Sequence, residues 1–317
     1  MNEQEAATRG WWLGLLGVTI FALTLPMTRL AVGDASAPQL PPSFVTFGRA
    51  AVAGLLSVLY LLACARLGHL HRPRGREWAL LAGTATGVIV GFPLGLALAL
   101  RHVPSTHAAV VTGLLPLATA AVAAVWLRQR ARPAFWAWGV LGSALVVGFM
   151  VERAGGWHLG PADGWLLLAM ASAAMGYVGG ARLTPRLGAE RVIGWVLVIG
   201  LPLTVPLAMW TWPDAPMAIR AASWAAFGYV SVFSMWIGFF AWYRGLALGG
   251  AVRVSQVQLV QPFLSLVFAV PLLGETLDAA TLGFGAAVIL TVLLGKRSAT
   301  PVPPLPAEAR RDAGPNT

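Results

Sequence analysis

Uncharged polar side chains occur at helical spacing inside a long apolar stretch near the C-terminal end of this sequence. Gln258, Gln261 and Ser265 lie within the apolar residues 251–273, and residues three or four apart share one face of a helix. Pro262 lacks a backbone N–H, and its ring crowds the carbonyl of Gln258, so we expect a kink at this polar face. Amides and hydroxyls placed in this way can bind a solute through hydrogen bonds without charge.

A second group of candidate binding residues combines hydroxyl groups with aromatic rings. Thr112 and Thr119 lie in a separate apolar stretch, and Tyr177, Trp236 and Tyr243 lie in two more. Aromatic walls with a few polar groups suit a small amphipathic or zwitterionic solute, so we expect these residues to line one cavity. The alternative is that each polar side chain bonds only a neighbouring helix, an interaction worth about 0.6 kcal/mol on average in membranes.

Arg49 is the charged residue that lies clearly inside an apolar stretch, more than one turn beyond Phe44. An arginine in hydrocarbon is costly unless it snorkels, pairs or faces water. Two roles remain open for it. Arg49 either contacts an anionic group of a solute, or it is structural and reaches the outer headgroups or the carbonyls of a kinked neighbour.

The signatures of enzymatic chemistry are absent from the sequence. There is no His-Glu-x-x-His, no Gly-x-Ser-x-Gly, no phosphate-binding glycine loop and no pair of carboxylates inside an apolar stretch. His69 and His71 have no carboxylate or cysteine nearby, which favours a solvated basic loop over a metal site. We therefore expect no catalytic residue, no metal ion and no cofactor. Coupling through an intramembrane carboxylate also lacks an evident residue.

The elements that hold these side chains must cross a membrane. The chain has 317 residues, of which 57% are hydrophobic and 11% charged, whereas soluble domains have about 25% charged residues. Since a spanning helix needs roughly 20 apolar residues, we expect an all-α membrane protein with about ten transmembrane helices. The expected spans are 10–32, 44–65, 78–98, 105–127, 133–151, 164–181, 192–212, 221–243, 251–273 and 279–294.

The net charge of +10 comes from arginines in the connections between apolar stretches rather than from one basic face. We therefore expect no nucleic-acid partner, and the sequence leaves the oligomeric state open. Because cytoplasmic loops carry an excess of Lys and Arg, we place both termini in the cytoplasm. The inside connections then carry Arg66, Arg72, Arg74, Arg76, Arg128, Arg130, Arg132, Arg182, Arg186, Arg191, Arg244 and Arg253, and the outside ones Arg29, Arg101, Arg153 and Arg220.

Glycine and proline residues indicate close packing and bending. Gly83, Gly87, Gly91 and Gly95 are each four residues apart, which predicts one ridge without side chains where another helix can approach. Pro26 lies near the outer end of the first span and frees a backbone carbonyl about one turn earlier. A break at that point exposes polar backbone, which only a protein-lined or wet cavity tolerates.

The sequence contains an internal repeat. A shift of 146 residues aligns Thr112 with Gln258, Pro116 with Pro262 and Thr119 with Ser265 without a gap. Five helices per half is an odd number, so the halves have opposite orientations in the membrane, as in transporters that work by alternating access. The expected organisation is a cytoplasmic N-terminus (1–9), a first repeat (10–151), a linker (152–158), a second repeat (159–295) and a disordered cytoplasmic tail (296–317).

The C-terminal part of the chain resembles an EamA-type permease of the drug/metabolite transporter superfamily. The residues that carry the resemblance are Trp242-Tyr243-Arg244, Gly249-Gly250-Ala251, Gln261-Pro262, Gly274-Glu275-Thr276 and Gly283-Phe284-Gly285. The resemblance implies a bacterial inner-membrane permease, and family members export amino acids and other metabolites. We therefore expect a permease for a small organic metabolite, with an amino-acid-like solute and the export direction favoured. The alternatives are a sugar or drug carrier, a membrane sensor or scaffold without transport, and an intramembrane enzyme.

Overall fold

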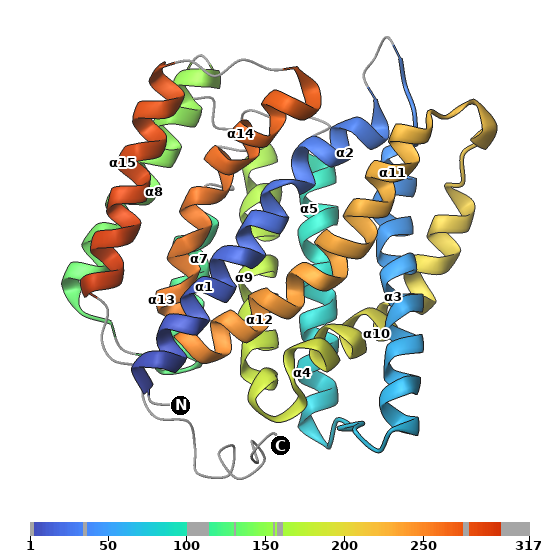
Figure 1. Ribbon diagram of the computed structural model, residues 1–317, viewed down its shortest axis with the longest axis horizontal. Helices are drawn as coiled ribbons and strands as arrows, with labels where there is room; N and C mark the ends of the chain where they lie inside the picture. Colours follow the sequence, from blue (N-terminus) through green and yellow to red (C-terminus); the bar gives the residue numbers. More distant parts are fainter. Residues whose placement is uncertain are drawn as a thin grey trace.

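The computed structural model describes residues 3–33, 37–99, 114–129, 131–154, 156, 161–274 and 279–298. These residues form helices and the loops between them (Figure 1). The α-helices are α1 (Glu3–Ala22), α2 (Thr24–Val32), α3 (Pro42–Arg66), α4 (Arg76–Ala85), α5 (Phe92–Ala99), α7 (Leu115–Trp126), α8 (Pro133–Ala154), α9 (Pro161–Leu187), α10 (Ala189–Trp210), α11 (Ala221–Tyr229), α12 (Gly238–Gly249), α13 (Ala251–Ser255), α14 (Gln261–Leu273) and α15 (Ala279–Ser298). The π-helical segments are η1 (Thr86–Gly91) and η3 (Val230–Ile237), and the 3₁₀ segments are η2 (Pro216–Ala218) and η4 (Gln256–Val260).

Several of these helices are long and apolar enough to cross a membrane. Within the described residues, seven helical stretches meet that condition: Gln4–Val32, Pro42–Arg66, Arg76–Gly95, Asp163–Leu187, Ala189–Trp210, Ala221–Gly249 and Ala251–Leu273. Three shorter apolar helices are Leu115–Trp126, Pro133–Phe149 and Ala279–Gly295. The chain is therefore an all-helical, multi-pass membrane protein, as the composition predicts.

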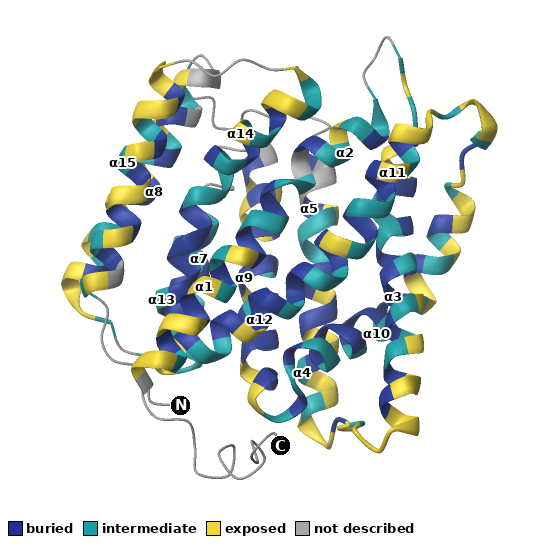
Figure 2. Ribbon diagram, in the orientation of Figure 1, coloured by how far each residue is buried: buried dark blue, intermediate teal, exposed yellow. Residues whose placement is uncertain are grey.

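The bundle has a buried centre flanked by more exposed helices. α1 packs along α12, and α9 packs along α4, η1 and α5. The pairs α8 with α15 and α3 with α10 lie outside this centre. Figure 2 shows buried residues along the central helices and exposed residues on the outer faces of the flanking ones. The first turn of α1 and the last turn of α15 lie at the same end of the bundle, the lower one in Figure 1.

The first span is interrupted, as Pro26 predicts. α1 ends at Ala22 and α2 begins at Thr24, with Leu23 as the residue between them. Pro26 has no N–H to offer the carbonyl of Ala22, four residues earlier. Ser265 in α14 supplies the missing donor, because its Oγ lies 2.7 Å from the oxygen of Ala22 and donates a hydrogen bond to it. A side chain of the second half of the chain thus satisfies the carbonyl freed at the break.

The span with the glycine ridge contains a π-helical segment that periodicity does not reveal. A Cβ atom at Gly87 or Gly91 would meet Ser172 of α9, and one at Gly95 would meet Trp165 and Ala169 of the same helix. Gly83 has no atom within 4 Å of such a position. A π turn takes up more residues than an α turn, so η1 rotates Gly83 away from the face that carries the other three glycines.

The polar span is irregular where Pro262 predicts a kink. Residues 256–260 are 3₁₀-helical, and α14 begins at Gln261 with the proline in its first turn, where a missing N–H costs nothing.

Glycines with positive φ connect consecutive helices at two turns. Gly250 has a φ of 82° and connects α12 to α13. Gly188 has a φ of 83° and is the one residue between α9 and α10. Positive φ favours glycine at both turns.

Candidate functional site

An aromatic cluster occupies the middle of the bundle. It consists of Phe21 from α1, Tyr177 from α9, and Phe239, Trp242 and Tyr243 from α12. The ring centroid of Tyr177 lies 5.6 Å from that of Trp242 and 6.2 Å from that of Phe239. Phe21 lies 5.1 Å from Phe239, and Tyr243 lies 5.2 Å from it. Three spans that are distant in the sequence therefore contribute rings to one continuous aromatic surface.

Missing side chains on neighbouring helices make room for these rings. A Cβ at Gly180 of α9 would overlap the ring of Tyr243, and one at Gly17 of α1 would lie 3.1 Å from the backbone of Trp242. Tyr243 is fully buried, and its hydroxyl is 3.5 Å from the carbonyl oxygen of Gly176. The Tyr243 ring is therefore packed against α9 and has no accessible surface. Tyr177 keeps some accessible surface and makes no hydrogen bond within the described chain.

Arg49 adds a positive charge beside this cluster. It lies at the start of the third turn of α3 and interacts electrostatically with Tyr177. Its side chain is partly accessible and has no hydrogen-bond or ion-pair partner among the residues that the structure describes. Ala53, one turn further along α3, is fully buried in the main hydrophobic core. Since residues four apart share a helix face, Arg49 points toward the bundle interior.

A second aromatic group extends toward the other half of α3. The ring centroid of Trp236 lies 6.2 Å from that of Tyr60 in α3 and 5.1 Å from that of Phe240. The indole Nε1 atoms of Trp236 and Trp242 are both buried without a hydrogen-bond acceptor in the described residues. A buried donor without a partner costs about 1 to 3 kcal/mol. The aromatic interior thus contains several donors that lack acceptors.

The polar residues expected to line a cavity have different environments. The hydroxyl of Thr119 donates to the carbonyl of Leu115 in its own helix, and that of Ser265 donates to Ala22. Gln258 is buried, with its Oε1 lacking a donor within the described chain, and Gln261 is half-buried. Thr112 lies outside the described residues. Of this set, Gln258 and Gln261 have the amide capacity left to bind a solute.

The Ser265 hydrogen bond leads to a test of its role. Ser265→Ala removes the donor to Ala22, so we expect purified protein to lose about 1 kcal/mol of stability, between the average of about 0.6 and the maximum of about 1.7 kcal/mol for such bonds in membranes. Thermal denaturation in detergent measures this loss. Ser298→Ala is the matched control, because its hydroxyl bonds only Leu294 in its own helix. Equal melting temperatures for the two variants, with transport lost in the first, would instead assign Ser265 to the solute site.

The periodicity of the sequence did not single out Gln256, although it joins three helices. Its Nε2 donates to the carbonyl of Phe135 in α8 at 3.3 Å. A Cβ at Gly139 in α8 or at Gly295 in α15 would collide with its amide. Gln256 therefore fixes η4 between α8 and α15. Gly139 and Gly295 indicate close packing in the sequence, but only the fold shows that Gln256 is the residue that packs against them.

Contacts between charged side chains gather at the end of the bundle where the chain begins. Arg186 of α9 donates from two nitrogens to both carboxylate oxygens of Glu77 in α4, and to the carbonyl of Arg72 at 3.2 Å. The backbone N–H of Arg74 donates to the same carboxylate at 2.7 Å. We call Glu77, Arg186 and residues 72–74 the lower latch. Its two-pronged arginine–carboxylate geometry is the strong form of an ion pair.

Aromatic packing joins the opposite end. Phe44 at the start of α3 lies 5.1 Å, by ring centroids, from both Trp212 and Phe227. The backbone N–H of Arg220 donates to Oε1 of Gln39 at 2.8 Å, and Ser223 donates to the carbonyl of Leu30. Both ends of the bundle therefore have contacts between early and late parts of the chain, and the aromatic cluster lies between them.

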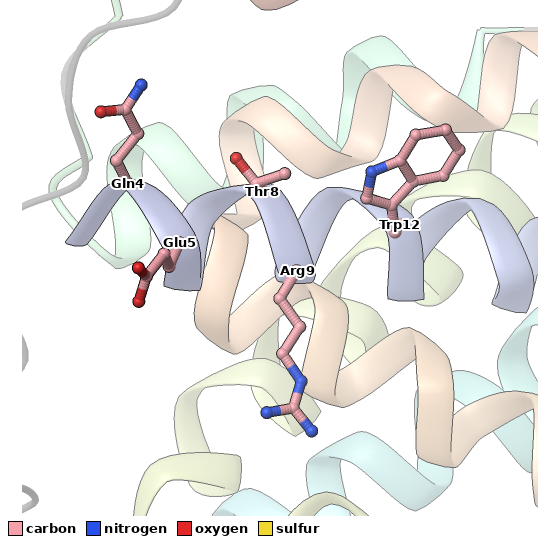
Figure 3. A pocket seen from close by; sticks show the side chains of 5 residues that line it. All are labelled: Gln4, Glu5, Thr8, Arg9 and Trp12. Atoms are coloured by element: carbon pink, nitrogen blue, oxygen red, sulfur yellow. The ribbon is translucent and has the colours of Figure 1, made fainter. Parts of the chain in front are cut away.

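An open depression of about 500 Å³ lies at the start of α1. Figure 3 shows the side chains that line it, which are Gln4, Glu5, Thr8, Arg9 and Trp12. All five come from the first three turns of one helix, so the depression belongs to the surface and not to the aromatic interior. Within the described residues, no group of three or more His, Cys, Asp or Glu side chains could hold a metal ion.

The described chain is thus a multi-pass helical bundle with an aromatic interior and with contacts between its halves at both ends. The sequence pattern of the EamA-like transporter family matches the chain twice, over residues 8–151 and 160–295. The chain therefore belongs to that family, and it is a transporter and not an enzyme.

Known proteins that resemble the chain agree with this assignment. It is 44% identical over 293 residues to the uncharacterized transporter YdeK of Bacillus subtilis (strain 168), covering 92% of this chain and 98% of that protein. It is 27% identical over 294 residues to a probable terminal-alkyne amino-acid exporter of Streptantibioticus cattleyicolor, covering 90% and 93%. A solved crystal structure that is 21% identical superposes with a TM-score of 0.71 over 98% of this chain and 99% of that one. This last likeness shows a shared fold.

Proposed function

We propose that this chain is a ten-helix permease of the bacterial inner membrane that exports a small organic metabolite by alternating access between two inverted five-helix halves. An amino-acid-like solute is favoured. The seven long spans and three shorter apolar helices of the described chain add up to this number of crossings. The two stretches matched by the family pattern lie close to the halves 10–151 and 159–295.

The pattern of helix packing is the observation that carries this proposal. α1 of the first half packs along α12 of the second, and α9 of the second half packs along α4, η1 and α5 of the first. If each helix is replaced by its counterpart in the other half, the contact of α1 with α12 becomes the contact of α9 with α4, η1 and α5, and the reverse. The pairs α3 with α10 and α8 with α15 each join a helix to its own counterpart. Exchanged pairs and self-pairs together are what a twofold axis between inverted halves produces.

The two π-helical segments support the same relation. The shift of 146 residues moves Thr86–Gly91 onto 232–237, inside Val230–Ile237. π-helical turns are rare and are often found at functional sites, so their occurrence at matching positions of both halves is informative. Each adjoins the aromatic interior, since η1 packs on α9 and η3 packs on α3.

The solute class follows from the interior and from one relative. Aromatic rings and two available glutamine amides suit a small solute with an apolar body and polar groups. The probable amino-acid exporter at 27% identity supports both the class and the direction. A sugar or drug carrier would use the same architecture, and a sensor or scaffold would show no flux.

Counterflow in proteoliposomes tests this function. We expect purified protein loaded with an unlabelled amino acid to accumulate the radiolabelled one, and empty liposomes to show no accumulation. A panel of amino acids, sugars and hydrophobic drugs separates the substrate classes. Protein that inserts in one orientation but gives no flux with any solute would contradict the permease and favour a sensor or scaffold.

The orientation has a test of its own. The arginine bias places both termini in the cytoplasm, and the lower latch carries several of these arginines. In a variant with Cys64 replaced by serine, a cysteine at Ser298 should resist a membrane-impermeant maleimide in intact cells, whereas one at Ala35 should react. Permeabilised cells, in which both should react, provide the control. The reverse pattern in intact cells would overturn the orientation.

A further inference from the structure

Arg49 is a cation without a counterion among the residues that the structure describes. It shares a face of α3 with Ala53 and Tyr60, because four and eleven residues are close to whole helical turns. Ala53 is fully buried and Tyr60 contacts Trp236, so this face borders the aromatic interior. A structural arginine in a membrane pairs with acids or backbone carbonyls. Within the described residues, Arg49 has neither kind of partner.

Three aromatic side chains in the described part of the interior have donor groups that make no hydrogen bond there. Tyr177, its electrostatic neighbour, has a partly accessible side chain and makes no hydrogen bond in the described chain. Trp242, whose ring lies 5.6 Å from that of Tyr177, has a buried Nε1 with no acceptor among the described residues, as does Trp236. A guanidinium group and indoles only donate hydrogen bonds, and a phenol can donate one. These groups favour a solute that brings a hydrogen-bond acceptor, and the charge of Arg49 favours an anionic one.

The acidic residues that the structure describes lie near helix ends or in loops, so they are not placed to pair with an amine in the aromatic interior. Every described Asp and Glu lies within three residues of a helix end or in a loop: Glu3, Glu5, Glu77, Glu152, Asp163, Glu190 and Asp214. Glu77 pairs with Arg186, and Glu190 lies 2.9 Å from Arg244. Aromatic faces attract cations, but the charge of Arg49 opposes that attraction beside Tyr177.

We propose that Arg49 recognises the carboxylate of the transported solute and that the site selects organic acids with an apolar body, without needing an α-ammonium group. This inference rests on the proposed permease function and narrows its solute class. The planar guanidinium fork binds a carboxylate through two parallel hydrogen bonds. The rings of Tyr177, Phe239 and Trp242 pack against the apolar body of the solute. An amino acid then binds through its carboxylate, and an acid without the amino group binds at least as well.

Four probes that share one phenyl body test the two charged groups separately. They are 3-phenylpropanoate, L-phenylalanine, 3-phenylpropanamide and 2-phenylethylamine. Their affinities are measured by tryptophan fluorescence of the purified protein and by competition in counterflow. We expect 3-phenylpropanoate to bind at least as tightly as L-phenylalanine, and the amide and the amine to bind at least about tenfold more weakly, since a hydrogen bond between charged groups is lost.

Variants of Arg49 connect this selectivity to its side chain. Arg49→Gln should weaken 3-phenylpropanoate about tenfold to a hundredfold and leave the amide unchanged, because only the charge-assisted contact is removed. Arg49→Lys keeps the charge without the fork and should give an intermediate loss. Arg66→Gln is the matched control, since Arg66 is exposed in the last turn of the same helix. It should bind all four probes like the unchanged protein.

Each remaining outcome decides against a specific claim. Equal binding of the amine and the acid overturns carboxylate selection, and so does equal weakening of all probes by Arg49→Gln together with a lower melting temperature. If the unchanged protein binds no probe but performs counterflow with a sugar or a drug, the solute class is wrong and the permease stands. If no solute gives flux, the permease fails first, and this inference fails with it.

Discussion

Replacing Gly87 with leucine should abolish the stable bundle, whereas the same change at Gly83 should be tolerated. A Cβ at Gly87 would collide with the backbone oxygen of Ser172 and lie 3.3 Å from backbone atoms of Gly176. Overpacking typically costs about 1 to 3 kcal/mol, and more when the obstacle is backbone that cannot change rotamer. We expect Gly87→Leu to cost at least about 3 kcal/mol, and Gly87→Ala to cost less.

Gly83 provides the comparison on the same helix. It is exposed and has no described atom within 4 Å of a Cβ position, so Gly83→Leu removes the entropic cost of a helical glycine without adding a clash. The yield of monodisperse protein and its melting temperature measure both variants. Equal behaviour of Gly83→Leu and Gly87→Leu would show that η1 does not separate these two glycines onto different faces.

Reversing the charge of Glu77 should open the lower end of the bundle. Glu77→Arg removes the ion pair with Arg186 and places a third cation beside Arg72 and Arg74 in the basic loop. The Arg186 and Glu77 side chains are 36% and 20% exposed, so solvent screens part of this energy. Even about 1.4 kcal/mol lost from the closed state would shift the open-to-closed ratio about tenfold.

Cys64, the only cysteine in the chain, reports on this opening. It is buried near the lower end of α3, one turn from Tyr60, whose ring contacts Trp236 and Phe240. We expect a small membrane-permeant maleimide to modify Cys64 about tenfold faster in Glu77→Arg, and counterflow to slow. The double variant Glu77→Arg with Arg186→Glu restores opposite charges and should bring the rate back toward its starting value. An unchanged labelling rate in Glu77→Arg would exclude the latch as a closure.

Local chain chemistry made the helices and their breaks predictable. Apolar length predicted the spans, Pro26 predicted the interruption at Leu23, and Pro262 predicted the irregular turn before Gln261. These effects act within about one helical turn, so no tertiary partner is needed to foresee them. The helices extend beyond the apolar stretches 164–181 and 192–212, because α9 continues to Leu187 and α10 begins at Ala189.

The environment of each polar side chain depended on distant partners. Periodicity placed Gln258, Gln261 and Ser265 on one face, but only the fold shows that Ser265 bonds Ala22 while Oε1 of Gln258 lacks a donor in the described chain. The structural role of Gln256 was not predictable from periodicity, because its partners in α8 and α15 are far away in sequence. Thr112 lies outside the described residues, so its role remains a prediction.

The matched π-helical segments have a consequence for the history of the chain. A π turn corresponds to one residue inserted into an α-helix, which the helix absorbs without ending. Under the proposed repeat, η1 and η3 occupy the same place in both halves. A single insertion in an ancestral five-helix gene, followed by duplication and fusion, accounts for both with fewer events than two separate insertions. Deleting one residue from either segment would restore the ancestral register and turn all preceding side chains of that helix by about 100°.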